Sequence, residues 1–124
     1  MNKRRPVYLS LTQFAWPVTA IASIGHRVSG IGLFAGIAYL LWLLDLSLSS
    51  EQGFNDVQAV MTQLLPKLIL LSVLAMLLYH LVAGVKHLLM DFHIGVSFAA
   101  ASGSAIATFV ITAVLTAALG VWLW

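Results

Sequence analysis

Three long apolar stretches constrain this chain more than any other feature. They cover about residues 18–44, 66–88 and 103–124, and very few ionisable residues interrupt them. A helix needs about 20 mostly apolar residues to cross the roughly 30 Å of hydrocarbon in a bilayer. A backbone in lipid must also satisfy its own hydrogen bonds, which favours helices. The sequence therefore predicts an all-α integral membrane protein, a single domain over residues 1–124 with three transmembrane helices running up, down and up.

Composition supports this class and excludes others. Of the 124 residues 61% are hydrophobic and 8% are charged, whereas soluble proteins carry about 25% charged residues. A free-standing soluble enzyme is therefore excluded. Three of the six basic residues lie together at Lys3, Arg4 and Arg5, so the remainder is slightly acidic and no nucleic-acid surface is expected. Cysteine is absent, which leaves histidines and a few carboxylates as the only metal ligands.

The positions of Lys and Arg predict the orientation. The basic tail precedes the first apolar stretch, whereas the connection from Asp45 to Pro66 is mainly acidic. Since Lys and Arg favour the cytoplasmic side, we expect a cytoplasmic N-terminus and a C-terminus on the outer side. Residues 1–17 are predicted to be a cytoplasmic interfacial segment, because the basic residues lie too far from the apolar stretch for a signal peptide. Serines and Gly53 predict a loop in the outer connection.

Small residues recur along two of the apolar stretches at helical spacing. Such stripes allow close contact between helices in lipid, either among these three helices or with a partner membrane subunit. The first stretch has Gly25, Ser29, Gly32 and Gly36, and the third has Thr108, Thr112, Thr116 and Gly120.

Ionisable residues within or beside the predicted spans mark function by default, because burying them in lipid costs free energy. They all fall in the half of the spans that we expect to face the cytoplasm. They are His26, Arg27, His80, Lys86, His87 and Asp91.

His80 is the candidate metal ligand. It lies six residues before Lys86, about 9 Å below the expected membrane rim, and His87 follows on nearly the same helical face. A haem standing along the helices would place its iron near His80 and its propionates near His87, with Gly84 leaving room for the flat macrocycle. Histidine is the expected axial ligand of a b-type haem. The alternative is an imidazole that only hydrogen-bonds a neighbouring helix, with Gly84 serving helix packing.

A second polar group begins the first span. Ser23, His26 and Arg27 share one helical face and offer hydroxyl, imidazole and guanidinium donors, which suit a quinone oxygen or a haem propionate. Alternatively, Arg27 extends to the lipid headgroups. Asp91 lies four residues after His87, where it could fix the tautomer of that histidine, belong to a proton path, or be an exposed carboxylate at a helix end.

Several runs together resemble the cytochrome b subunits of bacterial succinate dehydrogenases. They are RPV at residues 5–7, SIGHRVSG at 23–30, and HLVAGVKHL at 80–88 with Asp91 following. The combination of H-R-x-S-G with H-x-x-x-G-x-[KR]-H is specific, and the resemblance covers nearly the whole chain. Gly25 departs from the bulkier apolar residue that we expect between Ile24 and His26 in this family.

The resemblance implies a partner complex in the bacterial cytoplasmic membrane, with the C-terminus of this chain periplasmic. Together with a second small three-helix anchor subunit, the chain would hold an iron–sulfur subunit and a flavoprotein at the membrane. Electrons from succinate would pass through the iron–sulfur centres to ubiquinone, in the tricarboxylic acid cycle and the aerobic respiratory chain. The chain itself has no dicarboxylate site or flavin motif, so on its own it is expected to catalyse nothing.

The resemblance also implies roles for single residues. His80 would be an axial ligand of one haem b, with a histidine of the second anchor subunit as the other ligand. Ser23 and Arg27 would belong to the ubiquinone site, and Arg27, His26 and His87 would lie near the haem propionates and edge. Two alternatives are the anchor of a related quinol:fumarate reductase and a haem-free membrane scaffold or small transporter subunit.

Overall fold

The computed structural model describes residue 12 and residues 15–124. This part of the chain forms helices joined by short connections. Three of the helices are long and the second helix is short. Their bounds are α1 Val18–Ser49, α2 Glu51–Met61, α3 Leu64–Asp91 and α4 Phe98–Leu123. The predicted all-α fold is confirmed.

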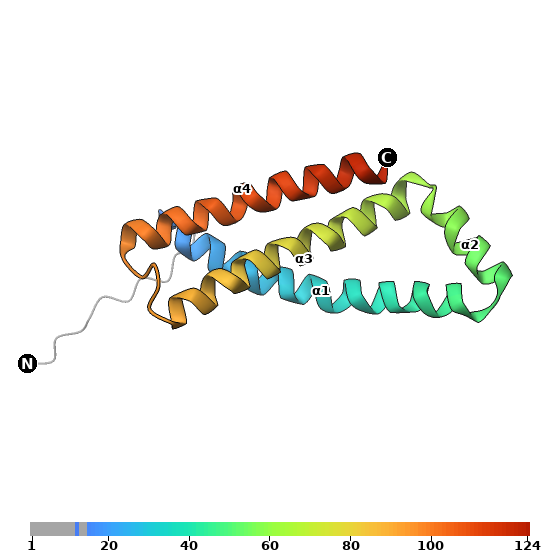
Figure 1. Ribbon diagram of the computed structural model, residues 1–124, viewed down its shortest axis with the longest axis horizontal. Helices are drawn as coiled ribbons and strands as arrows, with labels where there is room; N and C mark the ends of the chain where they lie inside the picture. The colour runs from blue at the N-terminus through green and yellow to red at the C-terminus, as the bar shows by residue number, and fades with distance from the viewer. Residues whose placement is uncertain (1–11, 13–14) are drawn as a thin grey trace, which may run out of the picture.

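The three long helices run up, down and up (Figure 1). They contain 32, 28 and 26 residues, so each is longer than the roughly 30 Å hydrocarbon core at about 1.5 Å per residue. The N-terminal end of α1 lies at the same end of the bundle as the α3–α4 connection, and α2 lies at the opposite end with the C-terminus. The candidate haem and quinone residues come from the first of these two ends.

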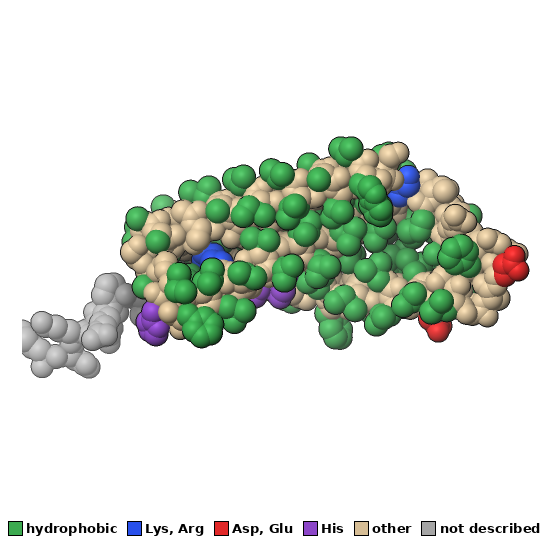
Figure 2. Space-filling view, in the orientation of Figure 1, with side chains coloured by type: hydrophobic (Ala, Val, Ile, Leu, Met, Phe, Trp, Pro, Cys, Tyr) green, Lys and Arg blue, Asp and Glu red, His purple; other side chains and the backbone are tan. Residues whose placement is uncertain are grey.

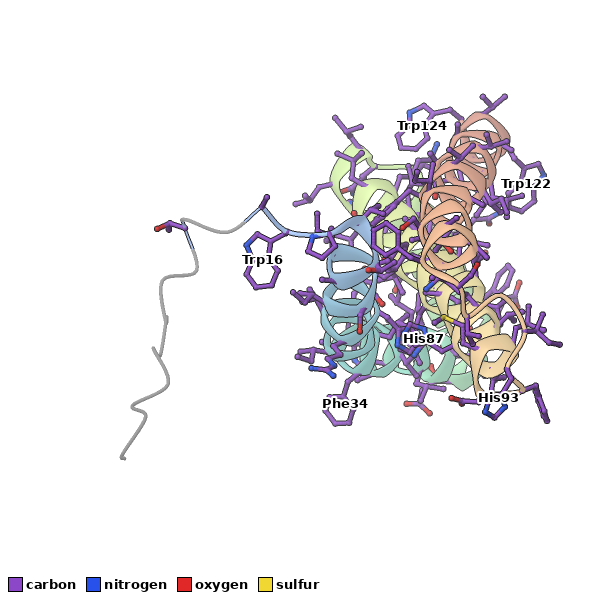
Figure 3. All side chains as sticks on the ribbon, turned by 90° about the vertical axis from the view of Figure 1, so that its left-hand side faces the viewer. Trp16, Phe34, His87, His93, Trp122 and Trp124 are labelled. Carbon is purple, nitrogen blue, oxygen red and sulfur yellow. The ribbon has the colours of Figure 1, made fainter. Side chains whose placement is uncertain are left out.

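The outside of the bundle is apolar. Figure 2 shows hydrophobic side chains along the whole length of the molecule, with Asp and Glu visible only at the α2 end. Phe34 is 85% exposed and Val121 is 83% exposed, and Phe34 and Trp122 point outward in Figure 3. Water would make these contacts costly, whereas lipid tails make them favourable. All three long helices are apolar enough to cross a membrane.

Small residues let α1 approach α3 closely. A Cβ atom added at Gly36 would lie 2.9 Å from both Cγ atoms of Val73, and one added at Gly32 would collide with the sulfur of Met76. At Gly25 the added atom would lie 2.7 Å from the hydroxyl of Tyr79. The aromatic side chain on α3 thus fills the space that a bulkier residue would take at this position.

The stripe on α4 also packs inside the chain. Thr108 is 2% exposed and donates its hydroxyl to the carbonyl oxygen of Ser104 at 2.9 Å. A Cβ atom added at Gly120 would make ordinary contact with Leu71 on α3, at 3.8 Å. Of the two alternatives for these stripes, contact among the helices of this chain is the one observed at Gly36, Thr108 and Gly120.

The connection between the first two long helices is mostly helical, so the prediction of a loop there was wrong. α1 continues to Ser49, and α2 occupies Glu51–Met61. The hydroxyls of Ser47 and Ser49 donate to carbonyl oxygens three residues earlier, at 2.8 and 2.7 Å, so these serines are accommodated within a helix. Ser50 then breaks α1 in an extended conformation and caps α2 by accepting the Gly53 N–H at 2.9 Å.

The sharp corner between α1 and α2 requires glycine at one position. A Cβ atom at Gly53 would collide with the carbonyl oxygen of Leu46. The serines and glycine that indicated a loop therefore form a helix–helix corner. At the other end of α1, Pro17 is the N-cap, and its carbonyl accepts the N–H groups of Ala20 and Ile21 at 3.0 and 3.2 Å.

The predicted interfacial segment, residues 1–17, lies mostly outside the described residues, and so do Lys3, Arg4 and Arg5. Its described part includes Trp16, which is 43% exposed next to the start of α1. The membrane orientation of the N-terminus therefore stays a prediction.

The close approach of α1 to α3 can be tested at Gly36. We expect Gly36→Leu to lower the thermal stability of the purified protein in detergent, because overpacking costs about 1–3 kcal/mol. Circular dichroism at 222 nm would follow the unfolding. Gly103→Leu is the matched control, since a Cβ atom there meets nothing within 4 Å. Equal melting temperatures for the two variants would contradict the packing described here.

Candidate functional site

Three histidines from two helices form one cluster near the end of the bundle that holds the α3–α4 connection. The ring of His26 on α1 stacks on the ring of His80 on α3, with 4.0 Å between centroids and 16° between planes. The ring of His87 stacks on His26 from α3 at 5.1 Å and 27°. In Figure 3 His87 lies within the outline of the bundle, whereas His93 points outward from the connection. Two histidines that share a face of α3 thus flank one from α1.

The backbone of α1 determines which nitrogen of a neutral His80 carries the proton. Its Nδ1 lies 3.0 Å from the carbonyl oxygen of His26. A carbonyl oxygen only accepts, so these partners assign the proton of a neutral His80 to Nδ1. Nε2 then keeps its lone pair, which is the form of histidine that binds a metal.

Ser29 completes this arrangement. Its hydroxyl donates to the same His26 carbonyl at 2.8 Å and lies 3.1 Å from Nδ1 of His80. Ser29 is 6% exposed. A hydrogen bond to the second ring nitrogen orients a ligating histidine and raises its basicity. The sequence predicted Ser29 only as a small packing residue. Its position three residues after His26 in the H-R-x-S-G motif was the feature that could have indicated this role.

Glycines keep space beside the histidine rings. A Cβ atom at Gly30 would lie 3.0 Å from Cε1 of His80, so α1 packs directly on the edge of this ring. At Gly84 an added Cβ atom would meet only Nε2 of His26, at 3.5 Å. The first glycine serves helix contact, and the second leaves a flat surface free beside the histidines.

An open groove of about 400 Å³ runs along this surface. Its walls are mainly apolar side chains of α3, and its polar atoms come from the three imidazoles. The lining residues are His26, His80, Leu81, Gly84, Val85, His87 and Leu88. The rings stack rather than converge, and in the described part of the chain no three metal-binding side chains could hold one ion. The groove is thus a mainly apolar surface with imidazole groups along it.

His87 is hydrogen-bonded to the backbone of its own helix rather than to Asp91. Its Nδ1 lies 2.7 Å from the carbonyl oxygen of Ala83, one turn earlier on α3. Asp91 is exposed at the last position of α3, and the described residues show no ion pair between it and His87. Of the three alternatives for Asp91, a pair with His87 is therefore not observed among the described residues, and Nδ1 of His87 donates its hydrogen bond to a backbone carbonyl. A proton path through Asp91 stays a prediction.

Ser23 and Arg27 lie one turn apart on α1, at the same end as the histidines. Ser23 is half-buried and Arg27 is exposed. Within the described residues, Arg27 has no ion pair with a carboxylate of this chain. Its guanidinium group is thus available to a ligand, a lipid headgroup or a partner protein. The hydroxyl of Tyr79 on α3 donates to the Ala22 carbonyl of α1 at 2.8 Å, and this hydrogen bond links the two helices in the same region.

Comparison with known proteins decides the family. The family model described as succinate dehydrogenase/fumarate reductase transmembrane subunit matches residues 1–119. The chain belongs to this family. Since that family is a transmembrane one and three helices here are long and apolar enough to span a bilayer, this member is a multi-pass membrane protein.

Curated relatives support the same assignment. The chain is 38% identical over 125 residues to a succinate dehydrogenase cytochrome b556 subunit from Coxiella burnetii, with all of both chains covered. It is 36% identical to a cytochrome b556 subunit from Paracoccus denitrificans, over 90% of this chain and 88% of the relative. A cytochrome b560 subunit from the alga Porphyra purpurea is 31% identical, over 73% and 74% of the two chains.

Proposed function

We propose that this chain is the membrane-anchor cytochrome b subunit of a bacterial succinate dehydrogenase, and that it ligates haem b and forms part of the ubiquinone site. The main support for the proposal is the position and hydrogen bonding of His80. Its Nδ1 is hydrogen-bonded to the His26 carbonyl of α1 at 3.0 Å, and its ring lines an open groove. The names of the relatives, cytochrome b556 and b560, support a haem protein.

The residues of the groove fit a haem. His80 offers the lone pair of Nε2, Gly84 leaves room for a flat ring system, and Leu81, Val85 and Leu88 supply apolar contact. When bound, haem b supplies a one-electron carrier. One side of the groove is open, and this chain would provide one ligand to the iron through His80. A second small membrane-anchor subunit would cover that side and provide the other ligand, so that one haem is shared.

His26 and His87 are suited to the haem edge. The Nδ1 proton of His87 is already donated to Ala83, so Nε2 is its remaining polar atom. In the imidazolium form Nε2 would donate to a propionate. Arg27 brings a permanent positive charge to the same end of α1, and it can hold either a propionate or a quinone oxygen by a charge-assisted hydrogen bond.

Ser23 and Arg27 are the residues proposed to bind ubiquinone. Their hydroxyl and guanidinium groups would donate to a carbonyl oxygen of the quinone and stabilise the negative charge that reduction places there. Asp91, exposed at the end of α3, would relay protons from the cytoplasm. The N-terminus would be cytoplasmic and the C-terminus periplasmic in the bacterial inner membrane, as the basic tail predicts.

The complete enzyme would need other chains. An iron–sulfur subunit would deliver electrons to the quinone, and a flavoprotein would oxidise succinate. This chain contributes binding and positioning, so it would be a non-catalytic subunit of the complex. The family model includes fumarate reductase subunits, and an anchor for that enzyme is the second candidate. We favour succinate dehydrogenase because the relatives reported above carry that name.

The haem assignment predicts the spectrum of the purified complex. We expect the wild-type complex to show a reduced-minus-oxidised b-type haem band, and we expect His80→Ala to lose or shift that band because an axial ligand is removed. His93→Ala is the control, since His93 is exposed on the α3–α4 connection. A wild-type complex without haem, or an unchanged band in His80→Ala, would contradict the assignment.

The quinone assignment predicts a difference between two assays. Arg27→Ala should lower ubiquinone reduction roughly tenfold or more, the effect of a lost hydrogen bond to a charged group, and Ser23→Ala should lower it by a smaller factor. Succinate oxidation by an artificial dye should stay largely intact in both, because the dye takes electrons before the quinone site. Ser49→Ala, which changes an exposed serine at the far end of α1, is the control. Equal losses in the two assays would rule out a quinone role.

A further inference from the structure

Lys86 is buried although it carries a charge. It lies near the end of α3 and is 8% exposed. Its Nζ donates to the sulfur of Met90 at 3.5 Å, and a thioether is a weak acceptor. An ammonium group has three donors, and leaving a buried charge without an anion is costly. Since the described residues show no carboxylate paired with Lys86, its anionic partner must come from outside this part of the chain.

A pocket of about 210 Å³ gives access to this lysine. It lies between the end of α3, the connection and the start of α4. Its lining residues are Lys86, Leu89, Met90, Ile94, Gly95 and Ser104, none of which lines the histidine groove. The Ser104 hydroxyl is already donated to the Ala101 carbonyl at 3.0 Å. Lys86 is therefore the only cationic group of the pocket, and it serves a different face of α3 from His80 and His87.

The surroundings of the pocket are apolar and exposed. Phe92 is 75% exposed, Ile94 57%, Val96 54% and Phe98 80%. These four residues alternate along the connection and the start of α4, at an end of the bundle where the helices leave the hydrocarbon. Large apolar side chains at such a position favour the boundary between acyl chains and headgroups. The anion that reaches Lys86 there has to be compatible with an apolar surface.

We propose that this pocket binds an anionic phospholipid, with its phosphate on Nζ of Lys86 and its acyl chains against the apolar residues of the connection. A phosphate oxygen would give Lys86 a charge-assisted hydrogen bond, which is stronger than its contact with the sulfur of Met90. The apolar rim and the single cation match the two parts of such a lipid. The lipid would help to fix the α3–α4 connection, and the site does not depend on the haem or quinone assignments.

The test is native mass spectrometry of the assembled complex in detergent, titrated with dioleoylphosphatidylglycerol. We expect Lys86→Met, which keeps a long apolar side chain, to weaken binding of one lipid about tenfold. Lys86→Arg should retain that binding. Lys67→Met is the matched control, because it removes the same charge from the opposite end of α3, where Lys67 lies over the ring of Trp124. It should bind as the wild type does.

Other outcomes would overturn the proposal. Unchanged lipid binding in Lys86→Met would overturn it. A loss of lipid binding in the Lys67→Met control as large as that in Lys86→Met would also overturn it. If Lys86→Met does not assemble, the wild-type complex still decides the question by comparing phosphatidylglycerol with dioleoylglycerol, which lacks the phosphate. Preference for the phosphate-bearing lipid supports the site, and equal binding of the two lipids refutes it.

Discussion

The close contact between α1 and α3 is the constraint on which the rest of the structure depends. It exists because Gly25, Gly32 and Gly36 present no side chains to α3, so the two backbones approach each other within the reach of Tyr79, Met76 and Val73. The same approach brings the His26 carbonyl within 3.0 Å of the His80 ring. Lipid provides no hydrophobic drive for helix association. Packing of small residues therefore both holds the bundle together and sets the orientation of the candidate ligand.

The candidate functional groups gather at one end of the bundle. One end of the bundle holds the histidine cluster, Arg27 and the Lys86 pocket, on separate faces of the helices. Towards α2, helices α1 and α3 diverge (Figure 1), and an apolar groove of about 470 Å³ lies between them. The candidate ligand-binding residues are thus concentrated at the end of the bundle that holds the α3–α4 connection. The diverging half is mostly apolar.

The sequence predicted the three long helices because each depends on a local property, the length of an apolar stretch. It also indicated His80, because a lone ionisable residue inside a span is costly wherever it lies. The hydrogen bond from His80 to the His26 carbonyl was not predicted, since it depends on how far α1 and α3 approach each other. The stacking of His26 between two rings of α3 depends on the same crossing.

The loop predicted near residue 50 was wrong, and the pair that the spacing of His87 and Asp91 allowed is not observed. Serines near residue 50 indicated a loop, but their hydroxyls are satisfied by carbonyls of the preceding turn, so the chain stays helical up to the Ser50 break. The spacing of His87 and Asp91 allowed a side-chain pair, but Nδ1 of His87 donates to the Ala83 carbonyl at 2.7 Å. In both cases a local backbone acceptor competes with the interaction inferred from residue types. Such competition is invisible in spacing alone.

The central claim is that His80 supplies one axial ligand of a haem through Nε2. Pulsed electron paramagnetic resonance of the oxidised complex tests it most directly, when this chain alone carries ¹⁵N-labelled histidine and its partners are unlabelled. We expect one strongly coupled ¹⁵N nucleus on the iron that is lost in His80→Ala, beside the ¹⁴N nuclei of the porphyrin and of the partner anchor's ligand. Coupling to ¹⁴N ligands only, or to two ¹⁵N ligands, would contradict it.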